Sequence, residues 1–168
     1  MNTHLNRNHK KIIFSVFLFI LSFNLCGCFG KPKNFSSDDL TITLTVDFNE
    51  RKSKDFNLYL SCDDVVFTAK KETASDLEAI GYEVSSLKGY CHELLNLNNQ
   101  PTSSLIQKND YYYFVNSEVS GGAKYTYVHF MFEHNKVYWV CNFVCKSKDY
   151  SRIEKYIFQW ADTITFKD

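Results

Sequence analysis

The stretch YYYFVNSEVSGGAKYTYVHFMFEHNKVYWVCNFVCK, residues 111–146, decides the fold that we expect for this chain. It contains three long runs that are rich in aromatic and β-branched residues, as strands are. The runs are 111–119, 123–134 and 137–146. Gly121-Gly122 separates the first two runs and Asn135-Lys136 the last two, and both pairs suit tight hairpin turns. The segment therefore predicts an antiparallel meander of three strands.

The residues before the meander predict a strand, a hairpin and a helix. Residues 40–46 alternate apolar and polar side chains, which predicts a half-buried strand with Leu40, Ile42, Leu44 and Val46 inward. Residues 56–70 predict a β-hairpin that turns at Asp63-Asp64. A short helical turn should end at Gly81. A longer helix should begin after a cap at Ser85 or Ser86, with Leu87, Tyr90, Cys91 and Leu94 on one face, and residues 103–108 should form a short strand.

The residues after the meander predict a closing helix, capped by Ser147 or Asp149. Its apolar stripe contains Tyr150, Ile153, Ile157, Trp160 and Ile164. A short strand over 163–166 could follow. Helices that interrupt antiparallel strands indicate the α+β class, with an antiparallel β-sheet flanked by helices.

The hairpin 56–70, the helix 87–95, the segment VYWVCNFVC (137–145) and the closing helix from Asp149 through WADTI (160–164) together resemble the Mog/PsbP-like family. The resemblance covers roughly residues 39–166 and implies an α/β/α sandwich. This family includes a photosystem II subunit-binding protein, a nuclear Ran-binding factor and bacterial lipoproteins of the DcrB and LpqN type. It implies binding or assembly of other proteins rather than catalysis, and it transfers no functional residue to this chain.

The first 28 residues resemble a bacterial lipoprotein signal. Basic residues precede an apolar run of 14 residues, 12–25, which is shorter than the ~20 residues that a membrane-spanning helix needs. Leu25-Cys26-Gly27-Cys28 then fits a lipobox, in which Cys28 is acylated and becomes the new N-terminus. We expect a signal peptide over residues 1–27, a lipidated tether over 28–38 and one domain over 39–168 that folds alone. An uncleaved anchor, or an ordinary cut after Gly27 or Gly30, is the alternative.

Removal of residues 1–27 removes three basic and no acidic side chains. The mature chain keeps 16 basic against 19 acidic side chains, a net charge of −3, so nucleic acid is an unsuitable partner. Four cysteines remain in the domain: Cys62, Cys91, Cys141 and Cys145. Cys141 and Cys145 share a predicted strand, where ~13 Å would separate their α-carbons and prevent a disulfide. A bond from Cys91 to one of them stays open, but we expect buried free thiols.

Catalytic and metal chemistry find little support in the spacing of reactive residues. Cys91 and His92 are neighbours in a helix and point ~100° apart, so the imidazole is badly placed as a base for the thiol. His129 and His134 should lie on opposite faces of one strand, and the cysteines lack the close pairs that structural zinc uses. We read Gly121-Gly122 as a hairpin turn and not as a phosphate loop. We therefore expect no enzyme, no metal and no cofactor.

The tyrosines offer the one candidate binding surface in the sequence. Alternation sends Tyr111 and Tyr113 to one face of the sheet and Tyr112 to the other, with Tyr125, Tyr127 and Tyr138 nearby. An exposed group of these rings would suit a protein or glycan partner. Helices on both faces of a sandwich would instead bury most of them, and that is the reading we adopt.

Together these features predict a non-enzymatic binding or assembly module of the bacterial cell envelope, a monomer or weak dimer. Lipid on Cys28 would hold it to the outer face of the cell membrane. A carrier with an internal apolar cavity is one alternative, and an envelope hydrolase is another.

We predict that the mature N-terminus is a lipid-bearing Cys28, with residues 1–27 removed. Two or more acyl chains at one site hold a protein stably to a bilayer. Mass spectrometry of the N-terminal peptide should find the lipid, and Cys28→Ala should release the domain or leave the precursor uncut. An unmodified N-terminus at Phe29 or Lys31 would contradict the prediction.

Overall fold

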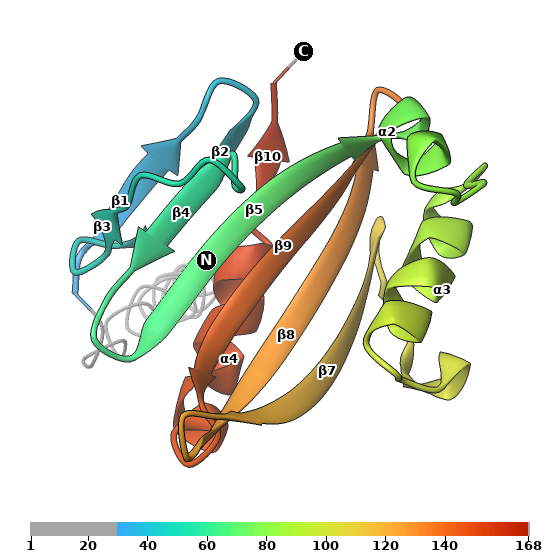
Figure 1. The fold of residues 1–168 in the computed structure, drawn as a ribbon. Helices are drawn as coiled ribbons and strands as arrows, with labels where there is room; N and C mark the ends of the chain where they lie inside the picture. The colour runs from blue at the N-terminus through green and yellow to red at the C-terminus, as the bar shows by residue number, and fades with distance from the viewer. Residues whose placement is uncertain (1–29, 168) are drawn as a thin grey trace, which may run out of the picture. The chain divides into compact units, whose positions relative to one another are not determined.

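Seven antiparallel strands form the main sheet of the computed structural model, which describes residues 30–167. Their order across the sheet is β3-β4-β5-β9-β8-β7-β6 (Figure 1). The strands are β3 (Asn49–Glu50), β4 (Leu58–Ser61), β5 (Val65–Thr73), β6 (Ile106–Lys108), β7 (Tyr111–Ser120), β8 (Ala123–His134) and β9 (Val137–Lys146). The predicted hairpin 56–70 is β4 and β5, and the predicted meander is β7, β8 and β9, so both predictions are confirmed.

The two turns of the meander adopt the backbone conformation that a tight hairpin requires. Gly121 and Gly122 have φ values of 56° and 78°, and Asn135 and Lys136 have 50° and 62°. Positive φ at both central residues is the mark of a type I′ turn, whose twist matches that of the flanking strands. Gly121-Gly122 is therefore the predicted hairpin turn.

A second sheet of three strands has the order β1-β2-β10. Its strands are β1 (Pro32–Ser36), β2 (Leu40–Thr45) and β10 (Thr165–Phe166). Leu40, Ile42 and Leu44 are fully buried as predicted, whereas Val46 lies just beyond β2 and is 48% exposed. The strand predicted at the end of the chain is thus present and pairs with β2.

The predicted tether 28–38 is too long, because β1 falls within it. Pro32 pairs with Thr45 and Phe35 pairs with Ile42, and the Phe35 ring is only 6% exposed. The burial of this ring draws the segment into the small sheet, although Pro32 and Lys33 made it resemble a linker. The folded unit accordingly begins at Pro32 instead of residue 39, and residues 1–29, with Cys28, lie outside the described part.

Two helices lie on one face of the main sheet: α2 (Ala74–Ala79) and α3 (Leu87–Leu97). Ser86 caps α3 by accepting a hydrogen bond from the backbone N–H of Gly89 at 3.2 Å. Tyr90, Cys91 and Leu95 are buried against Phe114, Met131 and Tyr138 of the sheet, with Leu87 and Leu94 at the edge of this cluster. The helix and its apolar face agree with the prediction, except that Leu95 rather than Leu94 lies deepest.

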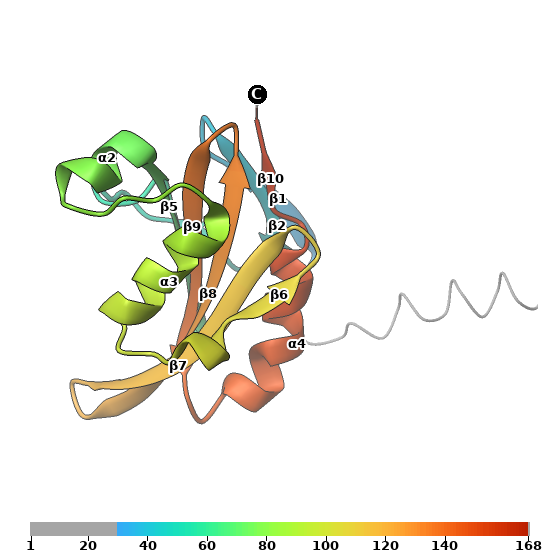
Figure 2. The same ribbon diagram turned by 90° about the vertical axis from the view of Figure 1, so that its right-hand side faces the viewer.

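The closing helix α4 (Tyr150–Ala161) packs on the opposite face of the main sheet, beside the small sheet (Figure 2). Ile153, Ile157 and Trp160 are buried, as the predicted stripe requires, while Ile164 lies after the helix end. The Trp160 ring meets the Phe48 ring edge-on at 5.4 Å and lies 6.0 Å from the Phe143 ring of β9.

The fold class is α+β, with antiparallel sheets and helices on both faces of the larger one, as predicted. One outer layer differs from a plain α/β/α sandwich, because α4 shares it with the small sheet (Figure 2). None of the helices in residues 30–167 is long and apolar enough to cross a membrane.

We predict that Trp160→Ala strongly destabilises the domain. Trp160 is 7% exposed, and truncating a buried aromatic side chain typically costs ~3–5 kcal/mol of unfolding free energy. Urea unfolding of the recombinant domain from residue 31 onward measures this loss. Gln159→Ala, an exposed neighbour on α4, is the control and should unfold like the wild type. A Trp160→Ala domain with unchanged unfolding free energy would contradict the burial argument.

Candidate functional site

The structure separates Cys91 from His92. The Cys91 thiol is fully buried against the sheet, and this burial raises its pKa to about 12. His92 lines a surface hollow with Lys88 of the same helix and Tyr112 of β7. The two side chains therefore point to different surroundings and cannot work as a nucleophile and its base.

The other predicted cysteines and histidines are also dispersed. Cys141 and Cys145 are buried and Cys62 is half-buried, and all four thiols of the domain are free, including that of Cys91, for which the sequence left a disulfide open. The His134 ring stacks on Phe166 on the α4 side, whereas His129 lies on the α3 side, so the predicted opposition of the two is confirmed. Across residues 30–167, no three His, Cys, Asp or Glu side chains come together as a metal-ion site would require.

The tyrosines divide into a group that packs against the helices and a group that no described helix covers. Tyr111 and Tyr113 pack on the α4 side, where Tyr113 meets the Phe158 ring at 5.0 Å. Tyr112 packs with the α3 cluster, and Tyr138 stacks on Tyr90 at 4.8 Å. The reading that helices bury the tyrosines holds for Tyr111 and Tyr138, whereas Tyr112 and Tyr113 are half-buried. Tyr125 and Tyr127 are also half-buried, but they lie on the α3 side of the sheet where no described helix packs over them.

These two tyrosines belong to an area that we call the open sheet face. It is the part of the α3-side face that no described helix or strand covers, and in Figure 1 it is turned toward the viewer. The strand registers place these residues on it: Tyr59, Ser61, Val66, Thr68, Asn116, Glu118, Tyr125, Tyr127, His129, Asn142, Val144 and Lys146. The area runs across five strands, from β4 to β7, while α3 packs over the ends of β7, β8 and β9.

His129 organises the polar centre of the open sheet face. Its Nδ1 lies 2.7 Å from Oδ1 of Asn142 on β9, and its Nε2 lies 3.0 Å from Oδ1 of Asn116 on β7. The ring is stacked between Phe114 at 4.3 Å and Tyr127 at 6.1 Å. The network thus joins the three strands of the meander through one side chain.

Burial governs the protonation of His129. The ring is only 8% exposed, and desolvation lowers its pKa to about 4 despite the opposing hydrogen bond with Asn142. The imidazole is therefore neutral near pH 7 and carries a single N–H. One amide oxygen accepts that proton, and the other ring nitrogen can accept a hydrogen bond only where the second amide turns its NH₂ group toward it. A neutral, doubly hydrogen-bonded imidazole positions its neighbours and is a poor proton donor.

The open sheet face is suited to contact rather than to chemistry. Its middle combines tyrosine rings, two valines and neutral hydrogen-bonding groups, while the exposed charges of Glu118 and Lys146 flank Tyr125 near the β7–β8 turn. Desolvation raises the pKa of Tyr127, so its hydroxyl stays protonated and can donate a hydrogen bond. Half-buried aromatic rings with polar ends are favoured at protein interfaces, because they bring large contact areas at low entropic cost.

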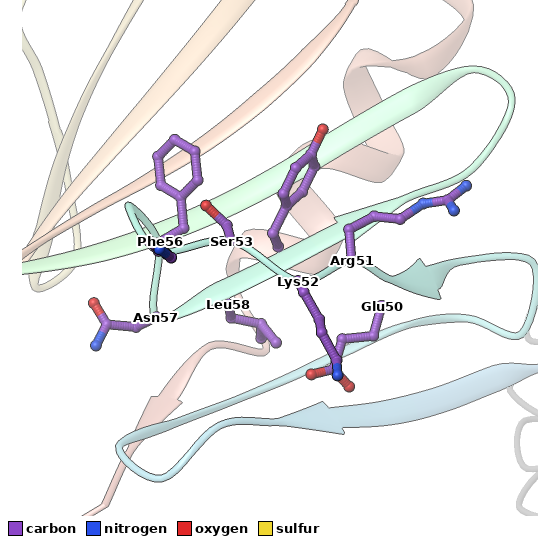
Figure 3. Close-up of a pocket in the computed structure, with 9 residues that line it drawn as sticks. Glu50, Arg51, Lys52, Ser53, Phe56, Asn57 and Leu58 are labelled. Atoms are coloured by element: carbon purple, nitrogen blue, oxygen red, sulfur yellow. The ribbon is translucent and has the colours of Figure 1, made fainter.

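A hollow of about 570 Å³ adjoins the open sheet face at its β4 edge. Residues 50–59, except Asp55, line it, and Figure 3 shows Phe56 pointing away from Glu50 and Lys52. The Phe56 ring meets Tyr59 of the open sheet face edge-on at 6.0 Å. The aromatic surface thus continues from the sheet onto this loop, whose opposite side is charged.

Comparison with known proteins finds likeness in structure alone. No protein-family model matches the chain, and no curated protein does. A crystal structure at 1.50 Å resolution of a protein from Bacteroides thetaiotaomicron VPI-5482 aligns with a TM-score of 0.52 at 16% identity. The alignment covers 83% of this chain and 49% of the other, so this chain spans about half the length of that protein. At this identity the likeness concerns the fold.

The solution structure of cyanobacterial PsbP (CyanoP) from Synechocystis sp. PCC 6803 aligns with a TM-score of 0.49 at 8% identity. That alignment covers 87% of this chain and 99% of CyanoP.

We predict that His129 makes the domain less stable in acid. Its pKa is about 4 in the folded state and ~6.5 when unfolded, so between these values the unfolded chain binds more protons. Stability therefore falls as pH drops from ~6.5 toward 4, by on the order of 3 kcal/mol for this group. Urea unfolding at pH 7 and pH 4.5 should show a smaller loss for His129→Gln than for wild type. Equal losses would contradict the prediction.

Proposed function

We propose that this chain is a lipid-anchored, non-enzymatic binding or assembly module of the bacterial cell envelope. The observation that carries the proposal is the open sheet face, whose half-exposed Tyr59, Tyr125 and Tyr127 have no described element above them. Exposed groups of large rings of this kind are typical of surfaces that other molecules cover.

A protein partner suits this face better than a small ligand does. The face is spread over five strands and lacks a deep central hollow, whereas small-molecule sites are concave and bury most of their ligand. Val66 and Val144 pair across β5 and β9 and supply an apolar middle. Tyr127 and the amides supply hydrogen bonds around that middle, the division between core and rim that protein interfaces show.

The anchor part of the proposal rests on the N-terminal sequence. Basic residues, a short apolar run and Leu25-Cys26-Gly27-Cys28 favour acylation of Cys28 and a place at the extracytoplasmic face of the cell membrane. The resemblance to bacterial lipoproteins with Mog/PsbP-like domains agrees with this place and with a role in binding. We propose no nucleic-acid partner, and a monomer or weak dimer in solution.

The carrier and hydrolase functions find less support than the binding function. A carrier would need an enclosed apolar cavity, whereas the hollows lined by Arg51, by Tyr111, by Tyr82 and by His92 are open to solvent. A hydrolase would need converging reactive groups, but Cys91 faces the core while His92 faces a surface hollow. These placements favour a binding module.

We predict that charging the open sheet face abolishes partner binding and preserves the fold. In the double variant Val66→Lys and Val144→Lys, both side chains are half-exposed, so the ammonium groups can reach water. Quantitative crosslinking and capture in the native membrane should lose a defined set of proteins that wild type retains.

The matched control is Ser151→Lys with Gln159→Lys, two exposed positions of α4 on the other side of the sheet. It adds the same charge and should retain the partner set. Equal capture by both double variants, at equal melting temperatures, would show that binding does not use the open sheet face.

A further inference from the structure

The chain enters the domain very close to the proposed anchor. β1 begins at Pro32, four residues after Cys28. Four residues span at most ~14 Å in any conformation. A domain of this size has a radius of gyration of ~14 Å, so the start of β1 cannot move farther from the bilayer than about one domain radius.

The strand registers place several other segments at the same end of the domain as Pro32. Pro32 pairs with Thr45 at the end of β2, and Asn49 of β3 pairs with Ser61 at the end of β4. Across the main sheet, Val65 pairs with Cys145 and Tyr125 pairs with Lys146. The β2–β3 connection, the β4–β5 turn and the β7–β8 turn therefore share one end, seen toward the lower left of Figure 1. We call it the anchor-proximal end.

The exposed side chains of the anchor-proximal end are mixed in character. Val46 in the β2–β3 connection is 48% exposed, and Val119 before the β7–β8 turn is 73% exposed. The charged side chains exposed at this end are basic at Lys33, Lys124, Lys146 and Lys148 and acidic at Asp47, Asp63, Asp64 and Glu118. Exposed valines among basic and acidic side chains in equal number suit the headgroup layer of a bilayer. Because the positive and negative charges balance, the contact should not depend on the charge of the lipid.

We infer that the anchor-proximal end lies against the lipid surface, with Val46 and Val119 at the contact. This orientation rests on the proposed acylation of Cys28. The opposite end contains α2 and the β8–β9 turn, and β8 alone, with 12 residues, is ~40 Å long. The open sheet face lies along these strands, so it stands beside the bilayer and stays accessible to a partner from the side.

Fluorophores on single cysteines test the orientation in the full-length, matured protein. In a Cys62→Ser background, Cys91, Cys141 and Cys145 are buried with raised pKa values and react poorly, and an acylated Cys28 has no free thiol. Val46→Cys and Val119→Cys carry the label at the anchor-proximal end. Ile80→Cys, 69% exposed after α2, carries it at the opposite end. The protein is placed in phosphatidylcholine vesicles that contain a headgroup-attached quencher.

Labels at 46 and 119 should lose most of their emission, while the label at 80 keeps it, with or without added phosphatidylglycerol. Equal quenching at all three positions, or quenching at 46 alone, would overturn the orientation while the protein still floats with vesicles. Failure to float, with an unmodified N-terminus by mass spectrometry, would overturn the anchor and the orientation together.

Discussion

The register of β8 is the constraint on which the rest of the structure depends. This strand, the middle one of the meander, sends Val128, Phe130 and Phe132 to the α4 side and Tyr127, His129 and Met131 to the α3 side. Because side chains alternate with a period of two, a slip of one residue would exchange the two sets. A type I′ turn at each end of β8 prevents such a slip. The aromatic core under α4, the cluster under α3 and the His129 network all follow from this register.

The two faces of the main sheet are covered unequally, and the reason is geometric. Seven strands at ~4.8 Å spacing are ~30 Å wide, whereas one helix is ~10 Å across and covers about two strands. On one face the small sheet lies beside α4, and together they bury Phe67, Phe130 and Phe143. On the other face α3 is the only helix of more than two turns among residues 30–167, so no described helix covers β4, β5 or the ends of β8 and β9 near the β7–β8 turn.

The open sheet face tolerates this exposure because its polar groups bond to one another. Asn116 and Asn142 bind His129, and Thr126, on the reverse side, bonds to Ser117 and Ser147. Among the described residues, only the hydroxyls of Ser37 and Thr45 are buried without a partner, and neither lies on this face. A partner that docks here would meet side chains that are already held in place. It would lose little free energy in ordering them.

Local patterns in the sequence predicted most of the helices and strands. They did not predict how these elements are arranged in layers. Alternation and turn pairs located β4, β5 and the meander, and the spacing of Tyr90 and Cys91 located α3. The residues around β1 do not distinguish it from a linker. Its buried ring, Phe35, can be predicted only once Ile42 of β2 is known to lie opposite. Local patterns also fail to identify the open sheet face, because it is assembled from strands far apart in the sequence. The sequence named Tyr125 and Tyr127 among six tyrosines and favoured burial for most of them. Tyr59 and Val66 join these two only through pairings between distant strands.

One signal in the sequence could have revealed the open sheet face. Only one predicted helix of more than two turns precedes the meander, too few to cover a broad sheet on that side. The prediction of two fully covered faces came from the sandwich architecture and not from the length of the available helices. Once the sheet is seven strands wide, an 11-residue α3, ~16 Å long, cannot cover it.

The two faces of the main sheet have different roles, one in stability and one in contact. This difference explains how one small domain can remain stable and still offer a binding surface. The α4 side holds the large buried rings, so substitutions there change the unfolding free energy. The open sheet face holds half-exposed side chains whose burial in the monomer is incomplete, so substitutions there act mainly on what the face contacts. Thr68, Asn116 and His129 are the exceptions, because each lies on the open sheet face yet is at most 8% exposed. His129 is held between Phe114 and Tyr127. Its replacement would therefore change both the stability of the meander and the shape presented to a partner.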